Sequence, residues 1–127
     1  DLYHCKYSGG AAPGARIDDM YVVCGQAQRS VMWLHNKERR TDLFVHLLKR
    51  DADRVEGGRP TRFEVGTKDR LAQIRDLSRV CAVTLRVYIV QPGLSKTGAA
   101  DHQLALLGVT DRFLSETYQT PLKVYCG

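Results

Sequence analysis

Apolar residues recur at helical spacing over residues 31–54. Leu43 and Leu47 stand four positions apart, and Leu48 follows directly, so these side chains share one face of a helix. The pattern predicts a long helix over this stretch, and we expect it to be broken near Asn36 or Thr41.

Two further stretches show the same period. Residues 68–82 predict an amphipathic helix for which Thr67 is a suitable N-cap. Its inward stripe is expected to comprise Leu71, Ile74, Leu77 and Cys81. Residues 102–118 predict another helix, capped by Thr97 or Asp101.

Five short runs outside these stretches are typical of strands. They are "LYHCKY" at 2–7, "MYVVC" at 20–24, "RFEVGT" at 62–67, "TLRVYIV" at 84–90 and "LKVYC" at 122–126. The run at 84–90 is apolar throughout, which suits a central strand covered on both faces. We therefore predict an α/β fold: one three-layer domain over 1–127, with a mostly parallel twisted sheet of about five strands and helices on both faces.

The predicted sheet indicates where a ligand would bind. Ligands of such sheets sit outside the carboxyl ends of the strands, at the point where the strand order reverses. Three loops would then meet there, following the strands at 20–24, 62–66 and 85–90. A glycine-rich loop at 8–16 is expected to join the first two strands.

Length and composition fit a single globular domain. The chain has 127 residues, of which 43% are hydrophobic and 26% are charged, and this composition excludes a disordered or fibrous protein. No apolar run approaches the roughly 20 residues of a membrane span, so we expect a soluble protein. Because the chain begins with Asp1 and shows no secretory pattern, we expect a piece cut from a longer protein.

The cysteines favour a reducing compartment. Cys5, Cys24, Cys81 and Cys126 are scattered singly, which indicates buried free thiols in the cytoplasm rather than disulfides or a zinc site. The four histidines do not cluster with them at ligand spacings. We therefore predict no metal and no cofactor.

The stretch "QPGLSKTGAAD" at 91–101 is the first candidate site. The N–H groups from Gly93 to Thr97 could cradle a phosphate while Lys96 supplies charge and Ser95 a hydroxyl. The alternative is an ordinary strand-to-helix turn with a solvated lysine.

Basic residues on two predicted helices are the second candidate site. The net charge is +5, which is compatible with nucleic acid but not diagnostic of it. Lys68, Arg75 and Arg79 lie at i, i+7 and i+11 and could follow a phosphate backbone. The densest basic set, which includes Arg39 and Arg40, lies in the earlier helix. An ordinary solvated helix face is the alternative for both.

Catalytic patterns are weak. The spacing G-x-x-x-x-G-K-[ST] is absent, so we do not expect ATP hydrolysis by this chain alone. Asp18, Asp19 and Glu64 with Lys68 are faintly similar to the carboxylates and lysine of metal-dependent nucleases, but the spacing fits poorly. No catalytic residue is assigned.

The carboxyl half resembles a known family over roughly residues 85–125. The phrases "VYIVQPGLSK", "HQLALLGVT" and "LSETYQTPLKV" resemble the C-terminal ends of large bacterial ATPases related to the HerA and FtsK translocases. Among these is the ATPase subunit of phosphorothioation-dependent DNA restriction systems. The resemblance implies antiphage machinery in the bacterial cytoplasm, with ATP bound by an upstream domain.

Two functional hypotheses follow. The first is a non-catalytic C-terminal module of a restriction ATPase that positions DNA or a partner subunit. The second is a nuclease-like or phosphate-transferring domain that uses the strand-end loops, which requires carboxylates to converge near Lys68 or Lys96.

Overall fold

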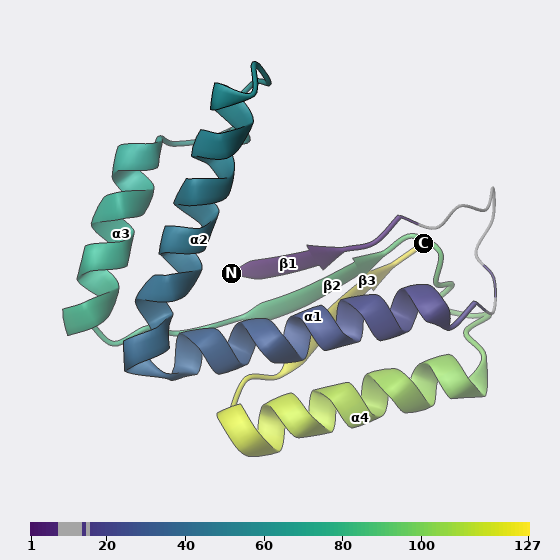
Figure 1. Cartoon of the computed structure of the whole chain (residues 1–127). Helices are drawn as coiled ribbons and strands as arrows, with labels where there is room; N and C mark the ends of the chain where they lie inside the picture. The colour runs from purple at the N-terminus through teal and green to yellow at the C-terminus, as the bar shows by residue number, and fades with distance from the viewer. Residues whose placement is uncertain (8–13, 15) are drawn as a thin grey trace. The chain divides into compact units, whose positions relative to one another are not determined.

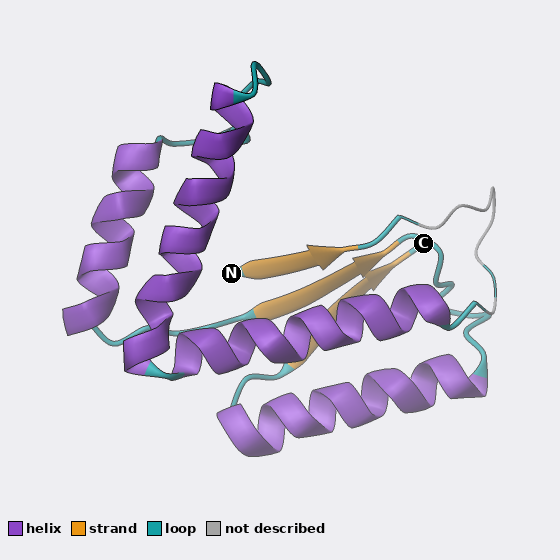
Figure 2. Ribbon diagram, viewed as in Figure 1, coloured by secondary structure: helices purple, strands orange, loops and turns teal. Residues whose placement is uncertain are grey.

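Seven helices and strands make up the part of the chain that the structure describes, which is residues 1–7, 14 and 16–127 (Figure 2). In this computed structural model they are β1 (Leu2–Cys5), α1 (Asp18–His35), α2 (Lys37–Glu56), α3 (Lys68–Val80), β2 (Val87–Gln91), α4 (Asp101–Tyr118) and β3 (Leu122–Cys126). They form two compact units. Unit 1 comprises Asp1–Val31 with Leu85–Gly127, and unit 2 comprises Met32–Thr84.

Unit 1 is built on a parallel sheet with the strand order β1-β2-β3. Parallel neighbours are joined by right-handed crossovers, and two such crossovers in the same direction place both helices on one face. Figure 1 shows α1 and α4 along the same side of the sheet. The core between helices and sheet includes Met20, Val23, Val87, Ile89 and Leu114, each at most 1% exposed.

The predicted five-stranded sheet is wrong, because the described sheet has three strands. Residues 20–24 belong to α1, where Met20, Val23 and Ala27 form a buried stripe at helical spacing. Residues 62–66 form no strand, and Val65 is 93% exposed.

The predicted three-layer arrangement with helices on both faces is also wrong for unit 1. Because the order β1-β2-β3 never reverses, this sheet has no switch point between strands. Of the three runs whose loops were predicted to meet, only the last forms a strand, so the predicted cluster of three strand-end loops is wrong. The loop predicted at 8–16 lies mostly outside the described residues.

Local helix signals are confirmed at two positions. Asn36 separates α1 from α2, and its side chain accepts hydrogen bonds from the N–H groups of Glu38 and Arg39 at 2.9 and 3.4 Å. Thr67 caps α3 by accepting from the N–H of Arg70 at 3.2 Å.

Other local expectations are corrected. The N-cap of α4 is Ala100, whose N–H donates to the side chain of Gln103 at 3.0 Å. On α3 the expected inward stripe is largely exposed, since Ile74 and Leu77 are 42% and 52% exposed. No helix in the described ranges is long and apolar enough to cross a membrane.

The cysteines differ in burial, contrary to the expectation of buried thiols. Cys24 is buried, whereas Cys5 and Cys81 are exposed. Burial raises the pKa of the Cys24 thiol, and a hydrogen bond with Thr110 partly offsets this.

Candidate nucleic-acid interface

The basic excess of the chain lies in unit 2. Twelve Lys and Arg residues against eight Asp and Glu give residues 32–84 a net charge of +4, out of +5 for the whole chain. Unit 1 is close to neutral. A surface that binds phosphates by charge is therefore expected on unit 2.

Arg40 is buried inside unit 2 and serves its packing. It is only 8% exposed, and it donates from Nε to the carbonyl of Leu34 at 2.8 Å and from Nη1 to that of Ser78 at 2.9 Å. These carbonyls stand in the last turns of α1 and α3, where helix dipoles favour a cation. Arg40 therefore ties two helix ends together, and we leave it out of the proposed surface.

Arg39 and Arg79 are exposed and lie at the same end of the α2–α3 pair. The hydrogen bond between Arg40 and Ser78 brings their immediate neighbours together. Figure 1 shows α2 and α3 side by side. Two guanidinium groups are thus available at this end.

The other two candidates on α3 lie near carboxylates. Arg75 donates to both carboxylate oxygens of Asp76, at 2.8 and 3.2 Å, and this pair holds the pKa of that carboxyl below its ordinary value. Lys68 is exposed and shares a cavity lining with Asp51 and Glu56. The net positive charge around Arg75 and Lys68 is therefore lower than the sequence indicated.

The 92–97 loop lies in unit 1, at the carboxyl end of β2. Its first N–H groups bind back to the end of β2: Gly93 donates to the Gln91 side chain at 3.2 Å and Leu94 donates to the Gln91 carbonyl at 3.1 Å. Gly98, just after the loop, donates to Ser95 Oγ at 3.1 Å. The Ser95 hydroxyl also lies 3.5 Å from that of Thr97. Lys96 is exposed, and among the described residues the structure shows no hydrogen bond or ion pair that holds its side chain in place. This geometry favours the strand-to-helix turn over the phosphate cradle.

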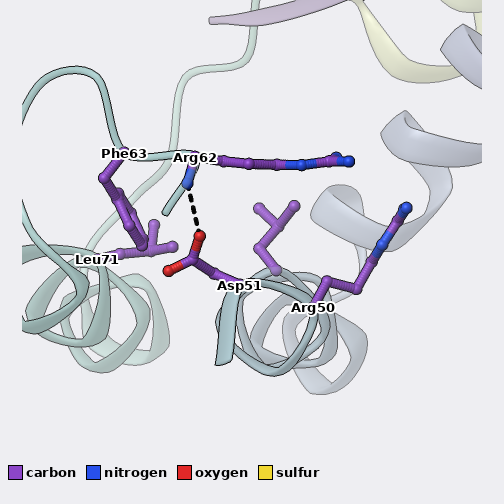
Figure 3. Close-up of a pocket in the computed structure, with 6 residues that line it drawn as sticks. Arg50, Asp51, Arg62, Phe63 and Leu71 are labelled. Atoms are coloured by element: carbon purple, nitrogen blue, oxygen red, sulfur yellow. Dashed lines mark hydrogen bonds between the residues drawn. The ribbon is translucent and has the colours of Figure 1, made fainter. Parts of the chain in front are cut away.

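A cavity of about 210 Å³ lies within unit 2, between α2, α3 and the segment that joins them. It is lined by Leu47, Arg50, Asp51, Arg62, Phe63 and Leu71. Figure 3 shows the side chains of Arg50 and Arg62 extending to one side, with Phe63 and Leu71 on the other. The cavity thus combines two cations with an apolar wall.

Asp51 holds the wall of this cavity in place. Its carboxylate accepts from the N–H of Arg62 at 2.8 Å and from the Thr61 hydroxyl at 2.9 Å. The backbone hydrogen bond from Arg62 is the main reason that the pKa of Asp51 lies below its ordinary value, and the charges of Arg54 and Arg62 add to it. Two guanidinium groups against this one carboxylate leave a net charge of +1 at the cavity.

Three tyrosine rings form a row on the sheet face of unit 1 opposite α1 and α4. The rings of Tyr3 and Tyr88 are 4.5 Å apart between centroids, and those of Tyr88 and Tyr125 are 5.9 Å apart. Lys123 Nζ lies 5.7 Å from the centre of the Tyr88 ring. Tyr3 and Tyr125 are each 55% exposed, so the row is a half-open surface.

The carboxylates expected for a nuclease belong to different units. Asp18 and Asp19 begin α1 in unit 1, whereas Glu64 and Lys68 lie in unit 2. Asp19 lies 4.0 Å from the side-chain nitrogens of two basic residues. Across residues 1–7, 14 and 16–127, no group of three His, Cys, Asp or Glu could hold a metal ion.

The sequence did not indicate Arg62 and Phe63 as site residues. Their segment was interpreted as a strand because "RFEVG" has strand-forming residues. The signal that could have found them is the preceding "GGRPT", which ends a helix and begins an irregular segment that can fold back onto it.

Comparisons with models of known protein families, with curated proteins and with solved structures found no match. Function is therefore inferred from the charge and geometry of the residues themselves.

Proposed function

We propose that this chain is a non-catalytic module that positions DNA, with unit 2 as its contact surface. The observation that carries the proposal is the uneven charge, since unit 2 has +4 of the net charge of +5. DNA-binding proteins neutralise phosphates with lysine and arginine, and this attraction needs no particular fold.

The exposed arginines of unit 2 support the same surface. Arg39 and Arg79 lie together at one end of the α2–α3 pair, and Arg50 and Arg62 extend to one side of the cavity (Figure 3). Like charges repel when they are held close together, so an anion that bridges them is stabilised. A DNA backbone offers such anions at regular intervals.

The larger context of the proposal rests on the resemblance over residues 85–125. A module of this kind would serve a bacterial restriction ATPase in the cytoplasm, and it would position DNA for a motor on an upstream domain. The chain lacks G-x-x-x-x-G-K-[ST], so the purified chain is expected not to hydrolyse ATP. Measurable ATP turnover would contradict the non-catalytic part of the proposal.

Binding of a labelled DNA duplex across a salt series tests the contact surface. The test variant is Arg50→Gln with Arg62→Gln, and the control is Arg29→Gln with Arg112→Gln in unit 1. Both double variants lower the net charge from +5 by the same amount, so any difference between them is local.

The test variant should bind more weakly and show a shallower salt dependence. Each lost phosphate contact lowers the slope of log K against log salt by about 0.9. The control should keep a slope close to that of the parent chain. Equal loss in both variants would show that net charge alone acts, and absence of binding at low salt would refute the proposal.

A further inference from the structure

We infer that the cavity of unit 2 takes one unpaired nucleotide of a DNA strand, with its phosphate at Arg50 and Arg62 and its base against Phe63. This inference rests on the proposed DNA contact and names the part of the DNA that the cavity would recognise. It implies that the chain prefers DNA with a single-stranded end or gap over a fully paired duplex.

The two sides of the cavity differ in chemistry, so they suit a ligand that has an anionic group and an apolar aromatic group. Arg50 and Arg62 extend to the same side (Figure 3), and guanidinium groups form paired hydrogen bonds with phosphate oxygens. Phe63 and Leu71 lie on the other side and offer an apolar surface with one aromatic ring. A nucleotide carries both an anion and a flat aromatic base.

The carboxylate of Asp51, which also lines the cavity, does not neutralise the two guanidinium groups. Asp51 accepts hydrogen bonds from the N–H of Arg62 and from the Thr61 hydroxyl, which are groups other than the two guanidiniums. Within the described residues, the structure shows no hydrogen bond or ion pair made by the guanidinium of Arg50. Net positive charge therefore remains where the phosphate would lie.

The size of the cavity favours a small enclosed group, such as one base. Its volume of about 210 Å³ lies below the roughly 300–1,000 Å³ of pockets for drug-sized ligands. A dinucleotide cofactor is therefore too large. A base in a duplex is stacked on both faces and paired along one edge, so only an unpaired or extruded base can lie against an aromatic wall.

The test compares two DNA probes on the full chain. One is a blunt duplex, and the other is the same duplex with a short overhang that carries the fluorescent base 2-aminopurine. The overhang probe should bind more tightly, and its fluorescence should be quenched on binding. Stacking of one base on an aromatic side chain corresponds to about a 5- to 160-fold gain in affinity.

Variants assign the effect to the cavity. Phe63→Leu should reduce the preference for the overhang and restore the 2-aminopurine fluorescence, whereas Phe113→Leu, which changes an exposed phenylalanine of α4, should do neither. Arg62→Gln keeps the ring and should also reduce the preference. Each variant is first compared with the parent chain, by Trp33 fluorescence for the changes in unit 2 and by tyrosine circular dichroism for Phe113→Leu in unit 1, so that a folding defect is recognised.

The outcomes separate this inference from the proposed function. Equal, salt-dependent binding of both probes would overturn the inference and leave the DNA contact standing. No binding of either probe would refute the DNA contact itself. A nucleoside monophosphate that competes as strongly as the overhang probe binds would show that the cavity takes a free nucleotide, and would overturn the assignment to a DNA strand.

Discussion

Replacing Arg40 by methionine removes a buried cation that joins two helix ends. Arg40 is 8% exposed and donates to the carbonyls of Leu34 and Ser78 at 2.8 and 2.9 Å. Methionine fills similar space but donates no hydrogen bond. Both carbonyls would then lose their partner in a place that water reaches poorly.

The magnitude follows from the two hydrogen bonds. A hydrogen bond that involves a charged group contributes about 1.5–3 kcal/mol, so the pair contributes about 3–6 kcal/mol to the free energy of unfolding of unit 2. With a urea dependence of about 1 kcal/mol per molar for a unit of this size, the lower value moves the midpoint by about 3 M. A loss of this size would leave unit 2 partly unfolded in buffer.

Trp33 provides the assay because it is the only tryptophan and belongs to unit 2. Its ring lies 6.0 Å from that of His46, so its fluorescence reports the packing against α2. Urea titrations of Arg40→Met are compared with those of Arg39→Gln, which removes the same charge from an exposed position.

The control should change the free energy of unfolding by less than about 0.5 kcal/mol, as exposed substitutions usually do. Arg40→Lys should be intermediate, because lysine keeps the charge but not the two-pronged geometry. If Arg40→Met and Arg39→Gln unfold at the same urea concentration, the structural role assigned to Arg40 is wrong.

Three predictions concern unit 1, which contains all six tyrosines, so tyrosine circular dichroism reports its unfolding. Leu114→Ala should lower the free energy of unfolding by about 2–5 kcal/mol, because Leu114 is fully buried, and a loss below about 1 kcal/mol would contradict that packing. Burial lowers the pKa of His4, so the folded state disfavours its protonation, and unit 1 should become less stable as the pH falls through 6.5. His4→Asn should flatten this dependence in melts at several pH values, and an unchanged dependence would assign it to another group. Alkylation followed by mass spectrometry should modify Cys5 quickly and Cys24 only after unfolding, and equal rates in the folded chain would contradict the burial of Cys24.

Two helix boundaries were predictable from sequence because their signals are local. Asn36 and Thr67 act on N–H groups two or three residues away, and the structure confirms the break expected near Asn36 and the cap expected at Thr67. The error over 20–24 has a physical reason. Met20, Val23 and Cys24 alone fit a strand or a helix, and only the continuation to Ala27 and beyond reveals the helical stripe.

The candidate site shows a second limit of sequence reasoning. Arg39 and Arg40 are neighbours in the sequence and have the same side chain. Arg39 is exposed, whereas Arg40 is buried, with an exposed fraction of 8%, and donates to two backbone carbonyls. Nothing within a few residues distinguishes them. The basic excess of residues 32–84 follows from composition, whereas the placement of Phe63 and Arg50 around one cavity depends on how the segment after α2 folds back.

The pairing of β1 with β2 sets the order in which the chain can fold. Leu2 pairs with Val87, so β1 is synthesised before α1, α2 and α3, and the strand that it pairs with in the described sheet follows them. Contacts so far apart in the chain form slowly, whereas α2 and α3 are close in sequence and can associate at once. A newly made chain therefore carries an unpaired strand while its helical pair is already closed, and this interval is when nascent chains are most exposed to aggregation.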